Sequence, residues 1–294
     1  METRTSDATG LLLVDKPPGV TSHDVVAIVR RVLGSRRVGH TGTLDPFATG
    51  LLVVLAGRGT RLIPYIDGEP KVYEATIRFG AETDTDDATG SIVREAAPPS
   101  ESAITDAVAQ LTGVIEQMPP AYSAKKVAGT RAYSAARRGV ALELRPSRIT
   151  IHSWELGQLS NDELTARITC SGGTYIRALA RDLGRLTNSA AHLSALRRVA
   201  SGAFTVDDAA TLDQLRAGDF TVRPLRDAVP SLPTRLIGDA ELVRVLHGNA
   251  IDVAEADSPV LSGAVALVDD TQTLIAVAER EGSELRPKLV LRDA

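Results

Sequence analysis

Residues 39–50 read Gly-His-Thr-Gly-Thr-Leu-Asp-Pro-Phe-Ala-Thr-Gly, and the elements predicted on either side are arranged around this stretch. Its three glycines, its proline and its lack of an apolar period predict a compact loop. Glycine lets the backbone approach a ligand closely, and Pro46 restricts the backbone of Asp45 before it. A lone Asp-Pro pair is more often a turn or a helix cap, so the loop alone leaves Asp45 open between that role and a functional carboxylate.

A strand and a helix are predicted before the loop, and a second strand after it. Residues 11–15 predict a short buried strand, and the apolar run at residues 51–56 predicts another. Ser22 is the expected N-cap of the intervening helix, and Gly34 is expected to end it. The apolar face of that helix comprises Val25, Ile28, Val29, Val32 and Leu33.

Residues 71–79 alternate between apolar and polar side chains, which is the period of a half-buried strand. Tyr73 falls on the apolar face, where a tyrosine is more often part of the core than of a functional site. A loop containing Asp84, Asp86 and Asp87 follows and closes at Gly90, and residues 102–112 predict an amphipathic helix.

Another alternating strand is predicted at residues 164–170, followed by Gly172-Gly173 and a helix over residues 174–186. The residues expected on the buried face of that helix are Ile176, Leu179, Ala180, Leu183 and Leu186. Arg177, Arg181 and Arg185 recur every four residues and predict a basic stripe on the opposite side. Arg181 and Arg185 are expected to be exposed. The most that we expect of them is contact with phosphates.

Strands and helices are mixed without regular alternation, which favours an α+β fold with a mainly antiparallel mixed sheet and flanking helices. Beyond Pro230 the composition changes to acidic segments and short apolar runs. We therefore expect a domain at residues 1–230 and a small β-rich domain at residues 231–294.

The composition narrows the class of protein. No apolar run approaches the length that spans a bilayer, so we expect no membrane association. No secretory signal is evident at the start, and the single cysteine, Cys170, fits a reducing compartment, so we expect a cytoplasmic protein. Five scattered histidines without a second thiol predict no metal site.

The net charge of −4 conceals an uneven distribution. Residues 231–294 hold 6 basic and 11 acidic residues, whereas residues 125–148 hold seven basic residues and one acidic residue. Local basic patches, not net charge, decide contact with phosphates. A run of charge is by itself usually a solvated surface.

The sequence contains no complete motif for a bound calcium ion or a nucleotide cofactor. Residues 84–90 superficially suggest a calcium loop, but the glycine comes one position late and the terminal glutamate is absent. Residues 57–60 lack the spacing of a phosphate-binding loop, and no glycine triplet has the dinucleotide fingerprint. We expect no cofactor.

Residues 39–50 closely resemble the catalytic loop of the TruB family of pseudouridine synthases. Further segments resemble the family in the same order, so that the similarity covers about residues 10–205. These segments are Leu12-Leu13-Val14-Asp15-Lys16-Pro17, Lys71-Val72-Tyr73, Thr83-Asp84-Thr85-Asp86, Pro119-Pro120-Ala121-Tyr122-Ser123-Ala124-Lys125-Lys126, Cys170-Ser171-Gly172-Gly173-Thr174-Tyr175-Ile176-Arg177 and Leu196-Arg197-Arg198.

The resemblance implies that Asp45 is the essential carboxylate, attacking either the ribose or the base of a flipped uridine. Arg177 matches the position whose guanidinium keeps that carboxylate ionised. Tyr73 matches the aromatic residue that stacks on the uracil, and it is a candidate for moving a proton.

The remaining roles are also carried over from the resemblance. Tyr175 matches a second tyrosine of the pocket, Leu196 an apolar wall, and His40 the histidine that fills the space left by the flipped base. Lys16 matches a lysine that steadies the loop, with a solvated lysine at the strand end as the alternative. The basic stretch at residues 118–148 matches a segment that grips the RNA stem-loop, and Lys125 and Lys126 are its expected contacts.

Together these roles imply a pseudouridine synthase fold acting as a monomer on uridine 55 of the tRNA T-loop. A tRNA folding chaperone that acts independently of chemistry is the alternative function. A glycoside hydrolase would need a second acid beside Asp45, and no segment supplies one convincingly. The C-terminal 64 residues are short for the PUA barrel that often follows this domain, so a reduced PUA-like domain is expected.

Overall fold

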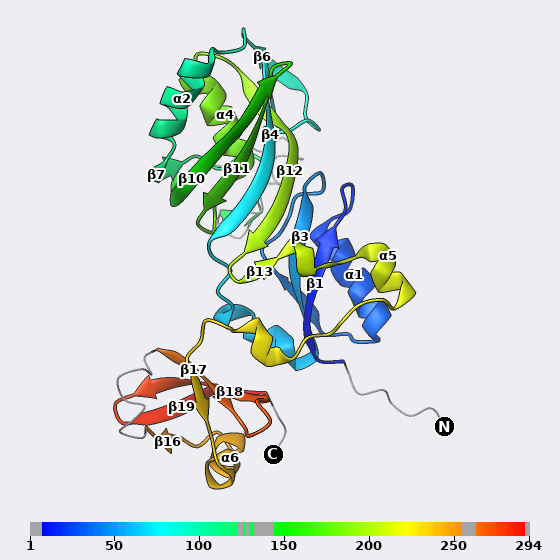
Figure 1. Ribbon diagram of the computed structural model, residues 1–294, viewed down its shortest axis with the longest axis vertical. Helices are drawn as coiled ribbons and strands as arrows, with labels where there is room; N and C mark the ends of the chain where they lie inside the picture. Colours follow the sequence, from blue (N-terminus) through cyan, green and yellow to red (C-terminus); the bar gives the residue numbers. More distant parts are fainter. Residues whose placement is uncertain (1–7, 123–125, 128–129, 132–143, 254–262, 292–294) are drawn as a thin grey trace.

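The computed structural model describes residues 8–122, 126–127, 130–131, 144–253 and 263–291, which form an elongated molecule (Figure 1). Most strands belong to one mixed sheet in the order β14-β1-β3-β12-β4-β11-β10-β7, with β2 beside β3 and β13 beside β12. Its strands are β1 (Gly10–Lys16), β2 (Val38–Thr41), β3 (Thr49–Ala56), β4 (Lys71–Phe79), β7 (Gly113–Gln117), β10 (Ser147–Ser160), β11 (Glu163–Cys170), β12 (Ala191–Ser201), β13 (Phe204–Thr205) and β14 (Ala210–Thr211).

The helices beside this sheet are α1 (Ser22–Leu33), η1 (Gly57–Tyr65), α2 (Glu101–Gln110), α4 (Ile176–Leu186), η2 (Val206–Asp208), α5 (Leu212–Ala217) and η3 (Leu225–Ala228). A short hairpin, β5 (Ala81–Thr83) with β6 (Ile92–Glu95), follows β4. The pairings β1 with β14 and β3 with β12 are parallel, and the other strand pairings of the main sheet are antiparallel in the part of the chain that the structure describes. The predicted α+β class with a mainly antiparallel mixed sheet is confirmed.

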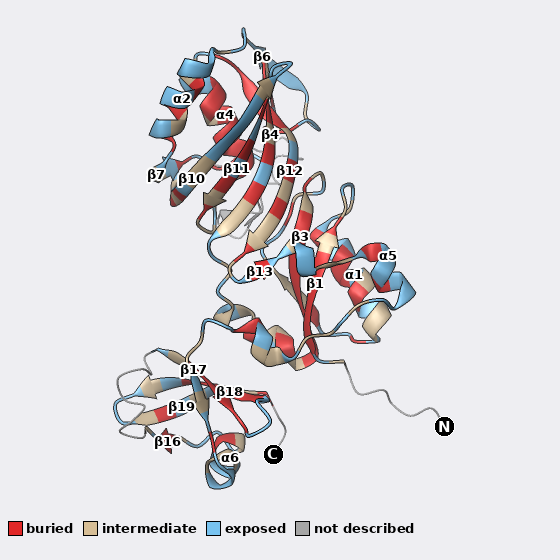
Figure 2. Cartoon of the chain, viewed as in Figure 1, coloured by how far each residue is buried: buried red, intermediate tan, exposed pale blue. Residues whose placement is uncertain are grey.

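The sheet consists of two halves that meet between β3 and β12 (Figure 1). Their pairing is limited to two residue pairs, Arg197 with Thr49 and Arg198 with Gly50. Separate apolar clusters support the halves: one packs α2 and α4 against the β4 half, and another packs α1 and α5 against β1 and β3. We call this junction the seam. Figure 2 shows buried residues along the strands on both sides of it.

The helix α1 begins one residue earlier than predicted. Thr21, not Ser22, is the N-cap, because its side chain accepts from the Asp24 N–H and the Asp24 carboxylate accepts from the Thr21 N–H. Gly34 ends the helix in the left-handed conformation, as predicted. Ser22 is buried, and its hydroxyl exchanges hydrogen bonds with the N–H and C=O of Leu44.

The alternation predicted for β4 is confirmed, with Tyr73, Ala75, Ile77 and Phe79 buried on one face. The predicted strand ending at Cys170 and the helix over residues 102–112 are also present, as β11 and α2. Two long strands, β10 and β12, were not predicted. In α4, Leu186 is 44% exposed rather than buried, because it is the last residue of the helix and lies beyond the packed face.

The C-terminal part forms a separate five-stranded sheet, β15-β17-β18-β19-β16, with α6 (Asp239–Leu246) against it. Its strands are β15 (Thr234–Leu236), β16 (Ile251–Asp252), β17 (Ala264–Val268), β18 (Leu274–Glu281) and β19 (Glu284–Val290). The predicted β-rich character is confirmed. The boundary at residue 230 and the PUA-like character remain predictions.

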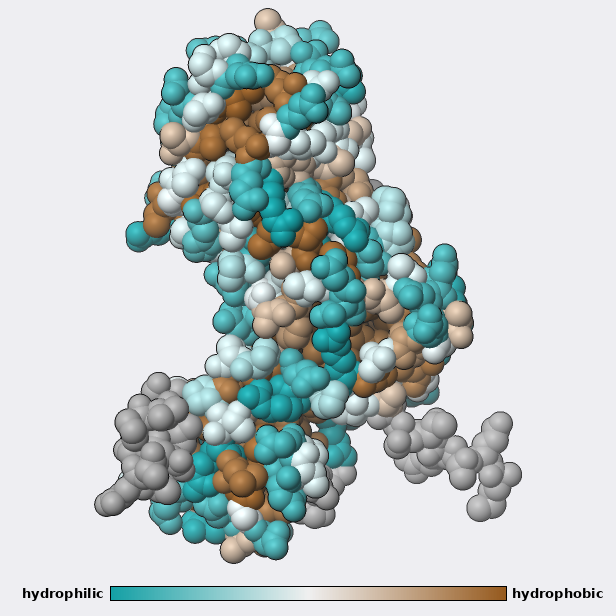
Figure 3. Space-filling model, viewed as in Figure 1, coloured by the Kyte–Doolittle hydropathy of each residue, from teal (hydrophilic) through white to brown (hydrophobic). Residues whose placement is uncertain are grey.

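One face of the C-terminal sheet shares an apolar cluster with β1, β3 and η1 of the main sheet; its members include Val277 and Leu289. Arg58 and Arg61 of η1 also donate to the carbonyls of Leu291 and Val290, at 3.0 and 2.8 Å. Figure 3 shows the surface hollowed on one side, between the β4 half of the main sheet and the C-terminal sheet. The C-terminal sheet therefore packs on the β1 half of the main sheet.

Candidate active site

The loop that carries Asp45 is shorter than predicted. Residues 39–41 belong to β2, which pairs with the later part of β3, and residues 49–50 begin β3, where they pair with β12. On either side of Asp45, Leu44 and Ala48 are buried in the apolar cluster of the β4 half. These two contacts carry the loop across the seam.

Lys16 holds this loop from the other side. Its Nζ donates to the carbonyls of Pro17, Val20 and Pro46 at 3.0, 2.8 and 3.2 Å, and its side chain is fully buried. Burial lowers the pKa of Lys16 to about 8, although Asp45 and Asp24 oppose the shift. The alternative of a solvated lysine is therefore wrong. The bond to Pro46 fixes the residue next to Asp45 and supports the loop-steadying role.

Arg177, in the first turn of α4, pairs with the Asp45 carboxylate, and its Nε lies 2.9 Å from Oδ2. The rest of its guanidinium group is also engaged. One terminal nitrogen donates to the Thr85 carbonyl and lies 3.4 Å from the Asp87 carboxylate, and the other donates to the Tyr122 carbonyl. The orientation of Arg177 is thus fixed by groups from three other segments of the chain.

The predicted basic stripe on α4 is not a free cationic surface. Arg177 and Arg181 are buried, and Arg181 pairs with Asp86 at 3.0 Å and donates to the Met118 carbonyl. Arg185 pairs with Glu82. The arginines meet carboxylates of the β5–β6 hairpin. The expectation of an exposed side chain is wrong for Arg181 and confirmed for Arg185, whose side chain is 54% exposed, and phosphate contact remains a prediction for both.

A cavity of about 260 Å³ opens beside Asp45. Of the predicted site residues, it brings together Asp45, Tyr73, Tyr175, Arg177 and Leu196. Its other lining residues are Gly42, Thr43, Leu44, Lys71, Gly173, Thr174, Ile176 and Arg198. The cavity is therefore bounded by an aromatic wall, an apolar wall and the Asp45 carboxylate. The Asp45 side chain is 39% exposed.

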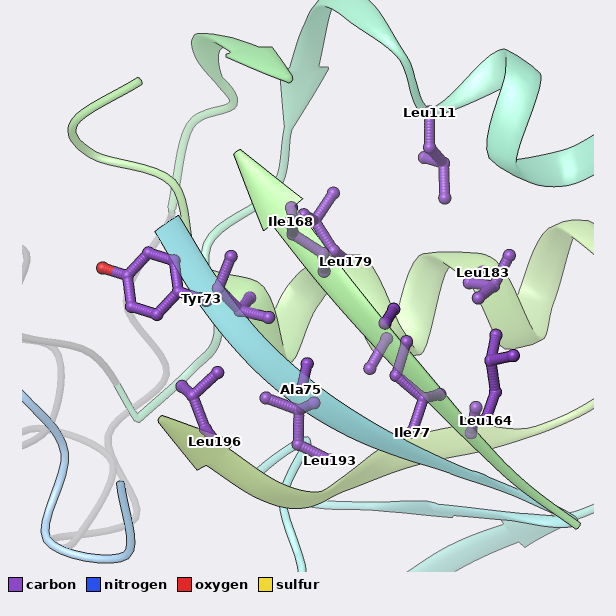
Figure 4. Close-up of a cluster of buried hydrophobic side chains, with 14 of the residues drawn as sticks. Tyr73, Ala75, Ile77, Leu111, Leu164, Ile168, Leu179, Leu183, Leu193 and Leu196 are labelled. Carbon is purple, nitrogen blue, oxygen red and sulfur yellow. The ribbon is translucent and has the colours of Figure 1, made fainter. Parts of the chain in front are cut away.

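Tyr73 lies at the end of the apolar cluster with its hydroxyl directed away from it, and Leu196 lies beside the ring (Figure 4). Burial raises the pKa of Tyr73 above its ordinary value, while Arg198 opposes the shift. The phenol is therefore neutral at physiological pH and remains able to donate or accept a hydrogen bond.

Burial raises the pKa of Asp45 above its ordinary value, and the nearby Asp87 carboxylate adds to the shift. Arg177 and Lys16 act in the opposite direction. The expected ion pair with Arg177 is present, but desolvation outweighs it. The carboxylate is consequently more basic than an aspartate in water.

The other predicted site residues lie elsewhere. His40 is in β2, paired with Val54, and does not line the cavity; burial lowers its pKa. Its Nδ1 is buried without a hydrogen-bond partner in the described chain. Lys125 and the side chain of Lys126 lie outside the described residues.

Lys71 and Arg198 line the cavity but were given no role from sequence. Arg198 is buried and donates to the carbonyls of Leu51 and Gly42, both at 2.9 Å. It therefore ties the start of β3 and the loop that carries Asp45 to β12. The sequence contained a signal for both residues. Lys71 lies two residues before Tyr73 in the motif Lys71-Val72-Tyr73, and Arg198 lies two residues after Leu196 in the motif Leu196-Arg197-Arg198.

No group of three or more histidine, cysteine or acidic side chains is arranged to hold a metal ion in the described residues. In the same residues, no helix combines the length and the apolar character needed to cross a bilayer. The arrangement beside Asp45 is suited to covalent or acid–base chemistry on a flat ring inserted between the walls.

Residues 30–176 match the model of the N-terminal domain of the TruB family pseudouridylate synthases. Residues 177–229 match the model of the tRNA pseudouridylate synthase B C-terminal domain. The chain belongs to the TruB family. The residues that line the cavity all fall within these two TruB matches, whose border passes through α4.

Curated relatives support the same placement in the TruB family. The tRNA pseudouridine synthase B of Thermobifida fusca is 47% identical, over 96% of this chain and 98% of its own length. That of Streptomyces coelicolor is 43% identical, over 92% and 93%. Among solved structures, a chain of a Cbf5-Nop10-Gar1 complex shares the fold with a TM-score of 0.71, at 24% identity over 97% of this chain and 85% of that chain.

Proposed function

We propose that this chain isomerises uridine to pseudouridine at position 55 in the T-loop of tRNA. The observation that carries the proposal is the cavity in which the Asp45 carboxylate faces Tyr73 and Tyr175. The names of the TruB relatives, tRNA pseudouridine synthase B, supply the substrate class and the reaction.

In the proposed reaction the target uridine leaves the tRNA stack and enters this cavity. The uracil stacks on Tyr73, and Tyr175 and Leu196 form the remaining walls. Asp45 assists cleavage of the bond between ribose C1′ and uracil N1; the ring turns, and C1′ bonds to C5. The C5 proton is lost and N1 gains a proton, so the exchange is redox-neutral.

The electrostatics of the cavity support this role. Catalysis by Asp45 as a nucleophile or base needs the ionised form, and a partly desolvated carboxylate is a stronger nucleophile and base than a solvated one. Arg177 provides the counter-charge at 2.9 Å. Action as a monomer is part of this proposal.

Release of tritium from tRNA labelled at uracil C5 tests the reaction. The Asp45→Asn variant should release no tritium while its affinity for tRNA stays near that of the unmodified protein. Asp106→Asn, on the exposed face of α2, is the matched control and should retain full activity. Turnover by Asp45→Asn close to the unmodified rate would overturn the proposal.

The position in tRNA is tested separately with two RNA stem-loops, one from the T arm and one from the anticodon arm. Turnover of the T-arm substrate alone is expected, and its loss when uridine 55 is replaced by cytidine. Equal turnover of both stem-loops would refute the specificity. If the Asp45→Asn protein accelerated tRNA folding as well as the unmodified protein does, a chaperone activity would also be present.

A further inference from the structure

Gln117 forms an unusual connection behind the tyrosine wall of the cavity. It is the last residue of β7 and is only 1% exposed. Its side-chain Oε1 accepts from the Tyr175 N–H at 2.9 Å, and its Nε2 donates to the Tyr175 carbonyl at 3.0 Å. One amide side chain therefore binds the backbone on both sides of the Tyr175 Cα.

Tyr175 needs such support because it stands at a helix end. It is the N-cap of α4, but its side chain makes no capping bond, so its backbone lacks the fixation that a serine, threonine or aspartate would provide. Its carbonyl also accepts the α4 bond from the Leu179 N–H at 3.1 Å. Fixing both peptide groups around Tyr175 fixes the direction of its Cα–Cβ bond, and hence where the ring enters the cavity.

The residues after Gln117 are bound to the same helix. The Met118 carbonyl accepts from Arg181 at 2.8 Å, and the Tyr122 carbonyl accepts from Arg177 at 2.8 Å. Gln117 is the member of this series that bonds to a cavity residue through its side chain. Its position is also set by strand pairing, since Gln117 pairs with Ser147 of β10.

We infer that Gln117 is a positioning residue for the reaction: it holds the Tyr175 ring against the flipped uracil without touching the substrate itself. This inference rests on the proposed function. A Tyr175 ring displaced by a fraction of an ångström packs less well against the uracil in the transition state, whereas RNA affinity depends mainly on phosphate contacts distant from the ring. Loss of Gln117 is therefore expected to lower kcat and to leave KM almost unchanged.

The direct test compares Gln117→Met with Gln214→Met on a T-arm stem-loop. Methionine keeps the length of the side chain and removes both hydrogen bonds. Gln214 is a matched control, because its amide also binds backbone at a helix start, the Thr211 N–H at 2.9 Å, but at α5. We expect kcat to fall on the order of 10-fold to 100-fold for Gln117→Met and to be unchanged for Gln214→Met.

A double-mutant comparison separates positioning from general loosening. If Gln117 acts through the Tyr175 ring, Gln117→Met should reduce kcat little further in a Tyr175→Leu background. Multiplicative losses would overturn the inference, as would an unchanged kcat in the single Gln117→Met variant. Equal losses in Gln117→Met and Gln214→Met would do the same.

Hydrogen exchange supplies a readout that does not depend on the reaction. The Tyr175 amide should exchange faster in Gln117→Met than in the unmodified protein, with the core of α4 unaffected. An unmodified protein that released no tritium would refute the proposed function. Unchanged exchange at Tyr175 would instead refute the positioning role.

Discussion

At the scale of single residues, the protein holds Asp45 where its charge is unfavourable. Burial raises the pKa of this carboxyl group although Arg177 lies beside it. A group whose pKa is higher in the folded state stabilises the fold when protonated, and this stabilisation is lost as the pH rises through the folded-state pKa. The charged form that the proposed reaction needs is therefore maintained at a cost in stability.

Asp45→Asn should accordingly raise the thermal unfolding midpoint at pH 7.5, because asparagine is neutral at every pH. The difference from the unmodified protein should shrink when the pH is lowered to 4, because a larger fraction of Asp45 is then protonated. Scanning calorimetry at the two pH values measures both effects. A lower midpoint for Asp45→Asn at pH 7.5 would contradict this account of the site.

Asp87 offers a second test at this scale, because its negative charge raises the pKa of Asp45. Removing the charge in Asp87→Asn should lower the pKa of Asp45 and move the acid limb of kcat/KM to lower pH. The rate itself should fall on the order of tenfold, since Arg177 loses one of its partners. An acid limb that stayed in place or moved to higher pH would argue against the assignment to Asp45.

Much of the site was accessible from sequence, since the motifs identified Asp45, Tyr73, Tyr175, Arg177 and Leu196, which line one cavity. Helical spacing could not show that Arg181 is buried. Its partner Asp86 lies 95 residues away in the chain, and only the fold brings the β5–β6 hairpin against α4. Gln117 was missed for the same reason, because it meets Tyr175 across 58 residues.

At the scale of secondary structure, the predicted elements follow regular periods and the missed ones do not. β4 alternates without interruption, whereas β12 has register shifts between Leu193 and Ala195 and between Arg198 and Ala200. Each shift breaks the two-residue period on which the prediction depends. β10 is mostly exposed over its second half and is irregular against β11, so it shows no clear apolar face.

Gly50 shows how closely β3 approaches β12 at the seam. Its φ is +100°, and a Cβ there would overlap the Arg198 carbonyl. Gly113 has a φ of +87° with nothing within 4 Å of a Cβ, so it is a matched control for the backbone conformation alone. Gly113→Ala should cost about 1–2 kcal/mol, and Gly50→Ala about 3 kcal/mol or more.

Chemical denaturation of the two variants measures these costs, and tritium release shows where the strain acts. Gly50→Ala should also lose most of its activity, because Arg198 must move away from the new Cβ. Asp45 lies only five residues before Gly50, so it should be displaced as well. Gly113→Ala should keep its activity. Equal costs for the two substitutions would mean that the close approach at the seam is not significant.

At the scale of the whole molecule, the C-terminal sheet packs on the β1 half of the main sheet. Leu289 and Leu285 of β19 provide a matched pair, since Leu289 belongs to the cluster shared with β1 and β3, and Leu285 to the cluster beneath α6. Each substitution to alanine should cost about 2–5 kcal/mol. Leu289→Ala should also accelerate hydrogen exchange in β1 and β3, and Leu285→Ala should not.

Peptide-level hydrogen exchange with mass spectrometry distinguishes these outcomes. Equal acceleration in β1 and β3 by both substitutions would mean that the C-terminal sheet and the main sheet unfold together whichever cluster is weakened. Composition indicated a change near residue 230, but it could not indicate that an apolar cluster continues across that point, because the shared residues are distributed over both parts of the chain.

The seam has a consequence for how the chemistry is assembled. Asp45 comes from the loop before β3, whereas Tyr73, Tyr175 and Arg177 come from β4 and α4 on the other side. The 2.9 Å ion pair between Asp45 and Arg177 therefore joins two bodies that each have their own apolar interior. Neither body alone carries all the groups of the proposed reaction, so that reaction would require the two bodies to be docked in register.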